Sequence, residues 1–384
     1  MQDFFEFRLG ARVLYKIGLA QEIGYEVERL GQKRALIVAD RGVIEAGLLA
    51  PVQESLSNSI ECVGVFADVP ANSSVQAVEA GAALARECNT DLVVAIGGGS
   101  CLDTAKCMRI LITCGGQLLD YQGYNMLDQP LVPMVAIPTT AGTGSEVTPF
   151  AVIHDERERI KLTFISPFLV PELAVLDPEL TCTLPPQLTA ATAMDALTHA
   201  IETFVSTDNN PISDSLALHA IESIANHLRD AMNNGANIIA RGQLLIAACM
   251  AGMAFSNSFL GVVHALAHAT GGRFPVHHGI ANAIFLLPGM QFNSVLVPDR
   301  YVPIGHALGV NAGGRSQVEV IVDCINAVRT LMIDCGLPTR LRDVGVPETA
   351  LEELADIALT DAAIFNNPRP LAREDLLLLL QAAW

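Results

Sequence analysis

The chain is poor in positive charge. Of its 384 residues, 23 are Lys or Arg and 41 are Asp or Glu, so the formal net charge is -18. Only four residues are lysines: Lys16, Lys33, Lys106 and Lys161. Proteins that bind nucleic acid or anionic membranes need clusters of cations. This composition therefore argues against both functions, and we expect no nucleic-acid partner and no membrane partner.

Paired cysteines and long apolar runs are also missing. The nine cysteines are scattered singly without a CxxC pair, which is not typical of a disulfide framework or a zinc ribbon. The longest apolar run, residues 244–255, is shorter than the roughly 20 residues that a bilayer span needs, and it is interpreted as a buried core helix. The N-terminus lacks the basic-then-apolar pattern of a signal peptide. We therefore expect a soluble cytoplasmic protein.

The first half of the sequence alternates short β-branched runs with helical segments. Strands are expected at residues 35–39, 63–66, 92–96 and 132–137, with helices between them such as residues 74–86. Strands separated in this way predict an α/β domain, a Rossmann-like parallel sheet with helices on both faces. Such sheets bind ligands at the carboxyl ends of their strands.

The second half has helical periodicity throughout. Helices are expected at residues 187–205, 216–228, 243–255, 260–269, 318–332 and 374–383. The chain is too long for one small core, so we expect an α/β domain over residues 1–185 and an all-α domain over residues 186–384. No low-complexity linker separates them, which favours a shared interface and a cleft.

A glycine-rich loop follows the strand expected at residues 92–96. Gly97, Gly98, Gly99 and Ser100 precede a helix, and such a turn lets backbone N–H groups bind a pyrophosphate. The alternative is a tight turn that needs glycine for its conformation. Lys106, about two turns into that helix, is either a phosphate counter-ion or a solvated surface lysine.

Two further loops carry polar groups at strand ends. Thr139, Thr140 and Thr143 lie in the stretch after residue 137, where hydroxyls can donate to ribose and phosphate. Asp40 follows the first strand, where a carboxylate binds ribose hydroxyls and repels a 2′-phosphate. That position favours NAD over NADP, although turn chemistry explains Asp40 equally well.

Histidines gather where acidic residues are absent. Residues 231–298 contain no Asp or Glu but hold His264 and His268, spaced i,i+4, and then His277 and His278. These last two follow Gly271-Gly272 and Pro275 and are expected in a turn that brings the chain back. Asp195 and His199 form another i,i+4 pair. Ligands paired on helical faces commonly hold a divalent cation; the alternative is a buried network of histidines and backbone groups.

These motifs, in this order, resemble the iron-containing, group III alcohol dehydrogenases. The resemblance rests on residues 97–106, 138–148, 195–202, 264–268, 278–279 and 366–369, and it covers nearly the whole chain. It is greatest to alcohol, lactaldehyde and propanediol dehydrogenases. It implies a dehydroquinate synthase-like architecture, with a metal and NAD(P) in a cleft between an α/β and a helical domain.

The resemblance also assigns roles position by position. It implies that Asp195, His199, His264 and His278 are the metal ligands, and that His268 lies near the nicotinamide and substrate. The implied cofactor contacts are Asp40, Asn72, Gly97, Gly98, Gly99, Ser100, Asp103, Thr139, Thr140, Thr143 and Lys161. Phe150 and Phe255 are expected to line the substrate pocket.

The function expected is that of a metal-dependent oxidoreductase. It would transfer hydride between a small primary alcohol or diol, or the aldehyde in reverse, and NAD, with His268 relaying the proton. Three histidines and one aspartate suit Fe(II) and Zn(II) alike, and a homodimer or higher homo-oligomer is expected. The alternatives are a lyase or cyclase of the dehydroquinate synthase type, which the scarcity of lysine disfavours, and a non-catalytic nucleotide- and metal-binding protein.

Overall fold

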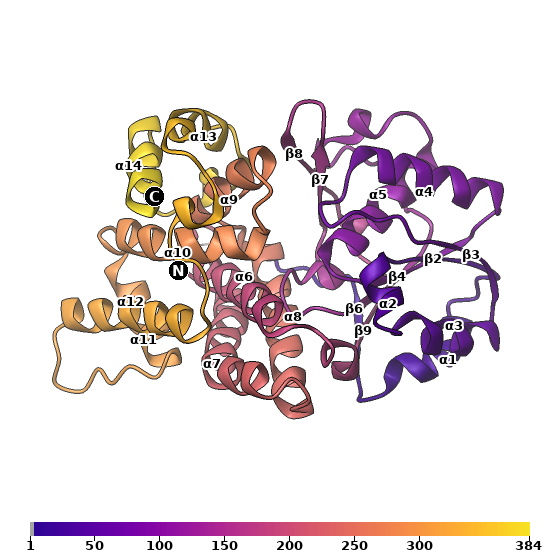
Figure 1. The fold of residues 1–384 in the computed structure, drawn as a ribbon, viewed down its shortest axis with the longest axis horizontal. Coiled ribbons are helices and arrows are strands. Elements are labelled where there is room, and N and C mark those ends of the chain that lie inside the picture. Colours follow the sequence, from indigo (N-terminus) through magenta and orange to yellow (C-terminus); the bar gives the residue numbers. More distant parts are fainter. Residues whose placement is uncertain (1–3) are drawn as a thin grey trace. The chain divides into compact units, whose positions relative to one another are not determined.

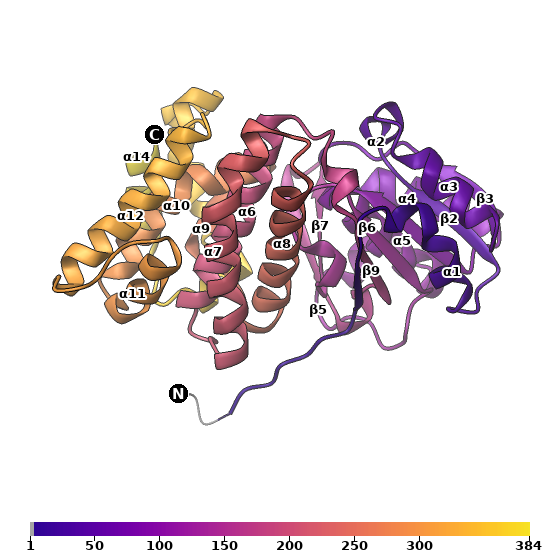
Figure 2. The same cartoon turned by 90° about the horizontal axis from the view of Figure 1, so that it is seen from below.

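The computed structural model describes residues 4–384, which form two compact units. Leu9–Leu184 make an α/β unit, and Pro185–Trp384, together with residues 4–8, make a helical unit. Figure 1 and Figure 2 show the two units from two directions, the first in indigo to magenta and the second in magenta to yellow.

The α/β unit is built on a six-stranded sheet with strand order β1-β9-β6-β4-β2-β3, in which all neighbours are parallel. The predicted parallel sheet is therefore confirmed. The elements are β1 (Arg12–Tyr15), α1 (Ile23–Glu28), β2 (Arg34–Val38), α2 (Arg41–Glu45), α3 (Leu49–Ser57), β3 (Glu61–Phe66), α4 (Val75–Glu87), β4 (Leu92–Gly97), α5 (Gly99–Cys114), β6 (Met134–Pro138) and β9 (Leu173–Leu176).

Alternate residues of each central strand enter different cores. In β2, Leu36 and Val38 belong to the core beneath α4 and α5, whereas Ala35 and Ile37 belong to the core beneath α1 and α3. Because both faces of the sheet are covered, its strands are hydrophobic runs without alternation. The chain reverses its direction of travel across the sheet between β2 and β4, which in open α/β sheets is the place where ligands bind.

A second, smaller sheet was not predicted. It has the order β5-β8-β7, with β5 (Gly123–Tyr124), β7 (Phe150–Asp155) and β8 (Ile160–Ile165). Strands β7 and β8 form an antiparallel hairpin. The four-residue turn of Glu156, Arg157, Glu158 and Arg159 is charged and lacks the Asn-Gly or Asp-Gly pair that marks tight hairpins, so the sequence carries little signal for it.

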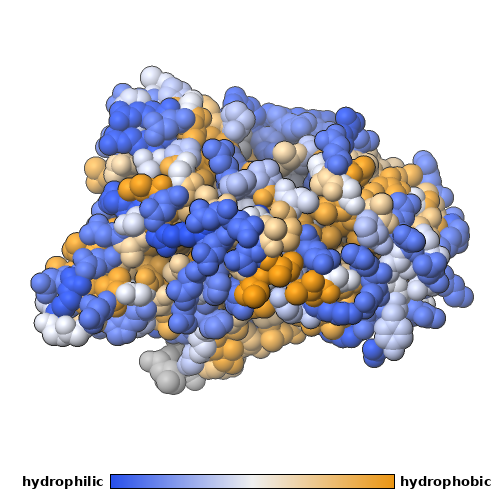
Figure 3. Space-filling model, turned by 60° about the horizontal axis from the view of Figure 1, so that its bottom comes forward, coloured by the Kyte–Doolittle hydropathy of each residue, from blue (hydrophilic) through white to orange (hydrophobic). Residues whose placement is uncertain are grey.

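The helical unit confirms the expected all-α half. Its α-helices are α6 (Pro186–Val205), α7 (Pro211–Asn233), α8 (Ile238–Ser258), α9 (Val262–Arg273), α10 (His278–Ser294), α11 (Pro298–Ala307), α12 (Gln317–Asp334), α13 (Leu351–Ala358) and α14 (Arg373–Ala383). Helix α8 is long and apolar enough to cross a membrane, but 67% of its most apolar stretch is buried, as in the core helix of a soluble protein. On the face drawn in Figure 3, hydrophilic and hydrophobic residues are mixed, as on most globular surfaces.

The turn expected at His277 and His278 includes His277 but not His278. Helix α9 continues through Gly271 and Gly272 to Arg273, and His278 begins the 17-residue helix α10. Gly272 is buried, so the absence of a side chain suits close packing here and does not end the helix. The chain turns between the two helices, in the segment of Phe274, Pro275, Val276 and His277.

Candidate metal and dinucleotide sites

Four side chains from three helices of the helical unit point toward one place. Asp195 and His199 lie one turn apart on α6, His264 lies on α9, and His278 is the first residue of α10. One donor atom from each of Asp195, His199 and His264 lies within 4.8 Å of the other two, and all three residues are buried. The fourth residue is close as well, since His278 Nε2 lies 3.6 Å from Asp195 Oδ1.

Asn282, one turn after His278 on α10, marks the point on which these donors converge. Its Nδ2 lies 2.6 Å from Asp195 Oδ1 and 3.1 Å from the Nε2 atoms of both His264 and His278. One lone pair each from the Asp195 carboxylate and from the imidazoles of His264 and His278 therefore points at the same amide NH₂ group. A divalent cation requires this arrangement of acceptors, so the residues present fit a metal ion.

The protonation states also suit a cation. Burial lowers the pKa of His264 well below its ordinary value, and His199 and His278 add to the effect, so the ring is neutral at pH 7. Burial alone would raise the pKa of Asp195, but His199 and His278 nearby and the hydrogen bond from Asn282 lower it overall. Neutral imidazoles and an ionised carboxylate are the forms that bind metal.

A glycine allows α10 to approach α6 this closely. A Cβ atom at Gly279 would collide with the backbone oxygen of Ala191 on α6. Gly279 follows His278 directly, and Asp195 lies one turn after Ala191. The contact between backbones therefore sets how near His278 comes to Asp195.

His268 lies beside this cluster on α9. Its ring stacks on that of His278 with centroids 5.3 Å apart, and its Nδ1 is 2.8 Å from Asp361 Oδ2. The Asp361 carboxylate also accepts a hydrogen bond from the backbone N–H of Ala363, which fixes its position. Since the carboxylate of Asp361 accepts, Nδ1 of His268 carries a hydrogen.

Phe255 of α8 packs against the same cluster. Its ring stacks on His199 with centroids 4.6 Å apart, and the Phe255 side chain is buried. Phe150, the other aromatic residue expected at the substrate pocket, begins β7 of the α/β unit and is half-buried. His277, which we noted in the histidine pattern, is the N-cap residue of α10.

In the α/β unit, the glycine loop lies at the end of β4. Gly97 has a φ of +155°, and a Cβ atom there would collide with Sγ of Cys101. The turn-conformation interpretation is thus correct for Gly97. Gly98 is the N-cap residue of α5 and makes no side-chain cap, so the first N–H groups of the helix remain suited to an anion. The phosphate-binding interpretation is compatible with this geometry.

The loop that carries Thr139, Thr140 and Thr143 packs against the glycine-rich loop of residues 97–100. The backbone N–H of Thr139 donates to the oxygen of Gly97 at 3.0 Å. A Cβ atom at Gly99 would lie 2.6 Å from Cγ2 of Thr143, and one at Gly98 would lie 3.4 Å from Thr140. Two loops that are separate in sequence therefore form one polar surface at adjoining strand ends.

Asp40 lies next to this surface. Its Oδ1 accepts from the N–H of Val43 at 2.9 Å and so caps α2, and its Oδ2 is 3.2 Å from the thiol of Cys101. The capping role expected from turn chemistry is present. The position at the switch between β2 and β4 is also the one that suits a ribose contact.

Three other predicted cofactor residues are linked to one another through residues 71–72. The side chain of Ser100 donates to the backbone oxygen of Ala71 at 2.6 Å. The adjacent Asn72 accepts a hydrogen bond from Lys161 Nζ of β8. Burial lowers the pKa of Lys161 to about 8, so its ammonium group remains charged at pH 7.

Asp103 and Lys106 are engaged inside the protein. Asp103 is half-buried: Oδ1 accepts from Ser145 Oγ at 2.6 Å and Oδ2 from the N–H of Val152 at 2.9 Å. Lys106 is fully buried, and its Nζ donates to Thr148 O, Thr148 Oγ1 and Phe150 O at 2.9, 3.1 and 2.7 Å. The interpretation of Lys106 as a solvated surface lysine is therefore wrong, and its interpretation as a phosphate counter-ion stays a prediction that the three contacts with protein oxygens disfavour.

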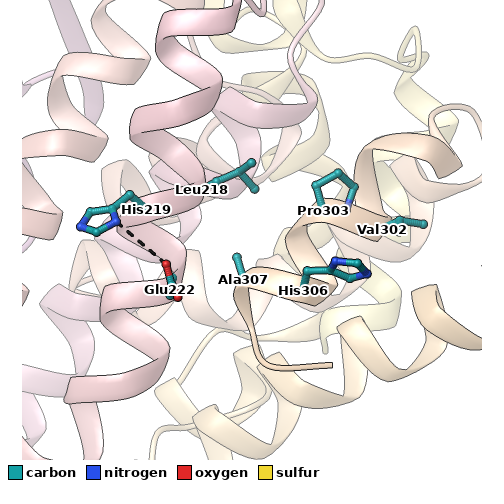
Figure 4. Close-up of a pocket in the computed structure, with 7 residues that line it drawn as sticks. All are labelled: Leu218, His219, Glu222, Val302, Pro303, His306 and Ala307. Atoms are coloured by element: carbon teal, nitrogen blue, oxygen red, sulfur yellow. Dashed lines mark ion pairs between the residues drawn. The ribbon is translucent and has the colours of Figure 1, made fainter. Parts of the chain in front are cut away.

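The helical unit has a further pocket between α7 and α11 (Figure 4). Its ionisable lining residues are His219 and Glu222 of α7 and His306 of α11, and Nδ1 of His219 lies 3.9 Å from Oε2 of Glu222. The remaining lining residues are Leu218, Val302, Pro303 and Ala307. None of the predicted site residues lines this pocket.

Comparison with known proteins identifies the family. Residues 10–178 match the iron-containing alcohol dehydrogenase model, and residues 189–384 match the C-terminal model of the Fe-containing alcohol dehydrogenase family. The chain belongs to the iron-containing alcohol dehydrogenase family and is an alcohol dehydrogenase. This membership favours an oxidoreductase over both the lyase and the non-catalytic alternative.

Individual relatives cover almost the whole chain. It is 38% identical to 1,3-propanediol dehydrogenase of Klebsiella pneumoniae over 94% of both chains. It is 36% identical to NAD-dependent methanol dehydrogenase of Bacillus methanolicus, over 95% of this chain and 96% of the relative. Among solved structures, 1,3-propanediol oxidoreductase superposes with a TM-score of 0.96 at 36% identity, covering 99% of this chain and 100% of the other.

Three residues of the cluster were missed by the sequence reasoning: Glu202, Asn282 and Asp361. Glu202 lies three residues after His199 on α6, and Asn282 four residues after His278 on α10. These helical spacings place both on the ligand side of their helices, and they could have been noticed. Asp361 lies 93 residues from His268, and no local pattern connects the two.

Proposed function

We propose that the chain oxidises a small primary alcohol or diol with NAD, or reduces the corresponding aldehyde with NADH, at a divalent metal ion. The observation that carries this proposal is the convergence of Asp195, His264 and His278 on the single atom Asn282 Nδ2, with His199 in the same cluster. The names of relatives that act on propanediol and methanol support the substrate class.

Asp195, His199, His264 and His278 would hold the metal. Three imidazoles and one carboxylate, with no thiolate, suit Fe(II) and Zn(II) alike. When bound, the cation acts as a Lewis acid on the substrate oxygen and makes the hydroxyl more acidic. Phe255, which stacks on His199, gives this place an apolar wall and helps to exclude water, and we propose Phe150 as a second apolar residue of the substrate pocket.

The two joined loops of the α/β unit would hold the dinucleotide. Backbone N–H groups of Gly98, Gly99 and Ser100, at the start of α5, would bind the pyrophosphate. Lys161, with its amide partner Asn72, adds a positive charge, and Thr139, Thr140 and Thr143 supply hydroxyl donors. When bound, NAD accepts the hydride from the carbinol carbon.

Asp40 would select NAD. Its carboxylate already caps α2 through Oδ1, which holds it at the strand end where the adenosine ribose binds in such sheets. A 2′-phosphate would bring two negative groups together there. We propose that Asp103 acts on the cofactor indirectly. It accepts a hydrogen bond from Ser145 and so holds the loop of Ser145 in place.

His268 would move the hydroxyl proton. The hydrogen bond to Asp361 places a proton on Nδ1, so Nε2 is free to accept a proton from the substrate side. The ring lies against His278, which places it next to the proposed ligand set. We further propose that the chain works in the cytoplasm as a homodimer or larger homo-oligomer.

An assay grid tests the function. Protein purified anaerobically and loaded with Fe(II) or Zn(II) is mixed with NAD or NADP and with short alcohols, diols or aldehydes. Absorbance of NADH should appear with alcohol and NAD, and NADP should be the poorer acceptor. If no substrate produced net NADH or consumed it, the oxidoreductase would be refuted in favour of a transient-NAD lyase or a binding protein.

A variant tests the ligand set. His264→Ala removes one imidazole from the cluster and should abolish metal retention, measured by elemental analysis, while NAD affinity stays close to that of the wild type. Cys335→Ala, at a buried position near the end of α12, is the control. A metal-replete and active His264→Ala protein would overturn the assignment.

A further inference from the structure

Helix α9 carries two of the histidines discussed above, yet it has no cap of its own. Its N-cap residue is Gly261, which has no side chain. The first N–H groups of a helix have no partner within the helix and need acceptors when buried. At the start of α9 the acceptors are two side chains from distant parts of the sequence, Glu202 and Asn367.

Glu202 of α6 is the first of them. Its Oε1 accepts from the N–H of Val263 at 2.7 Å, and its Oε2 accepts from the N–H of His264 at 3.3 Å. A Cβ atom at position 261 would lie 3.0 Å from Glu202 Oε1, so glycine leaves room for the carboxylate. Glu202 is 3% exposed, so its carboxylate forms hydrogen bonds with N–H groups at the start of α9 in place of water.

The same carboxylate also contacts the side chain of His264. Oε2 of Glu202 is 2.6 Å from His264 Nδ1. A carboxylate accepts at this distance, so Nδ1 carries the hydrogen and the lone pair lies on Nε2. That lone pair faces Asn282 Nδ2 at 3.1 Å, at the point where Asp195 and His278 converge. Ligating histidines commonly donate their second ring nitrogen in this way.

We infer that Glu202 is a positioning residue: it holds His264 in the Nδ1-protonated tautomer and aims Nε2 into the ligand cluster, while it joins that ring rigidly to the start of α9. The inference rests on the proposal that His264 binds a metal. Glu202 lies seven residues after Asp195 on α6. Helix α6 therefore supplies two ligands directly, Asp195 and His199, and orients a third, His264, through the carboxylate of Glu202.

Asn367 provides a matched comparison, because it caps α9 without contacting His264. Its Oδ1 accepts from the N–H of Val262 at 3.2 Å, and it exchanges two hydrogen bonds with Asn293 at 2.9 and 2.8 Å. Asn367→Ala therefore weakens the start of α9 but leaves the contact between Glu202 and His264. Loss of a hydrogen-bond acceptor at the start of a helix destabilises it, so both Asn367→Ala and Glu202→Gln should unfold at a lower temperature.

The first test measures the tautomer on metal-free protein, so it does not depend on the proposed function. Two-bond ¹H–¹⁵N correlation spectra distinguish Nδ1-protonated from Nε2-protonated rings. His264 should be Nδ1-protonated in the wild type and in Asn367→Ala, and should become a mixture or switch in Glu202→Gln. An unchanged tautomer in Glu202→Gln would overturn the inference and leave the metal site untouched.

The second test measures Zn²⁺ affinity by competition with a chromophoric chelator. Glu202→Gln and Glu202→Asp should each bind roughly 10–100-fold more weakly than the wild type, and Asn367→Ala within about threefold. Glu202→Asp keeps the negative charge but shortens the side chain by one methylene, so weaker Zn²⁺ binding in this variant is caused by the position of the carboxylate and not by its charge. If Glu202→Gln does not fold, the affinity of Glu202→Asp alone tests the inference.

Two results contradict the inference. Affinities of both Glu202 variants within threefold of the wild type, or a loss in Asn367→Ala as large as in Glu202→Gln, would show that Glu202 is only a helix cap. A wild-type chain that binds no Zn²⁺ or Fe²⁺ would instead refute the proposed function, and the inference with it.

Discussion

Lys106 is buried in the structure, whereas the sequence pattern suggested a phosphate counter-ion or a surface lysine, and replacing this residue tests the difference. Lys106→Met keeps the length of the side chain but removes an ammonium group that donates to Thr148 O, Thr148 Oγ1 and Phe150 O. It also removes the positive charge beside the carboxylates of the half-buried Asp103 and the buried Glu146. Removing one partner from such a buried cluster typically costs about 3–5 kcal/mol.

That cost should be visible in thermal unfolding. For a unit of this size, 1 kcal/mol corresponds to roughly 2–4 °C, so a loss of about 3 kcal/mol lowers the Tm of Lys106→Met by about 6–12 °C in scanning calorimetry. Lys33→Met, at an exposed position, should leave the Tm nearly unchanged. NAD affinity, measured by titration calorimetry below the transition, should change little in Lys106→Met and fall in Lys161→Met.

The reasoning about Lys106 would be refuted by the opposite pattern. If Lys106→Met unfolded within about 1 kcal/mol of the wild type but bound NAD much more weakly, the ammonium group would be a phosphate contact. The pattern of hydrogen bonds inside the α/β unit would then not describe the protein in solution.

The pH dependence of stability gives a second measure of the same burial. Burial lowers the pKa of Lys106 from 10.5 to about 8. Between these values the unfolded chain binds the proton and the folded chain does not, so the free energy of unfolding rises with pH. The wild type should therefore gain about 3 kcal/mol relative to Lys106→Met between pH 8 and pH 10.5. A constant difference over this window would contradict the lowered pKa.

Three further outcomes concern the metal cluster. Gly279→Ala introduces a Cβ atom against the backbone oxygen of Ala191, so Zn²⁺ affinity measured by chelator competition should fall, whereas Gly271→Ala, with 3.7 Å of clearance, should retain it. Asp361→Asn removes the carboxylate that holds His268, so kcat should fall about tenfold or more with metal content unchanged; an unaltered kcat would exclude a proton-relay role. Saturation with metal at 100 times its Kd should stabilise the chain by about 2.7 kcal/mol, and a chelator should reverse the rise in Tm.

Much of the fold could be predicted because its signals are local. The strands around Ile37 and Val94 are continuous apolar runs, since both faces of the sheet are buried. The helix that carries Asp195 and His199 was expected from its periodicity and its N-terminal prolines, and α6 begins at Pro186. The short strands β1, β5, β7, β8 and β9 were missed, because their pairing depends on partners far away in the sequence.

The sequence by itself determined the parallel sheet and the helical half, because strand runs and helical periods depend on neighbours within a few residues, and its resemblance to a family implied the candidate ligands. Only the tertiary structure decided what those side chains contact. It buried Lys106 among backbone oxygens, and it brought Glu202 to His264 and Asp361 to His268 across 62 and 93 residues. Contacts at such separations arise from helix packing, and no local pattern of residues encodes them.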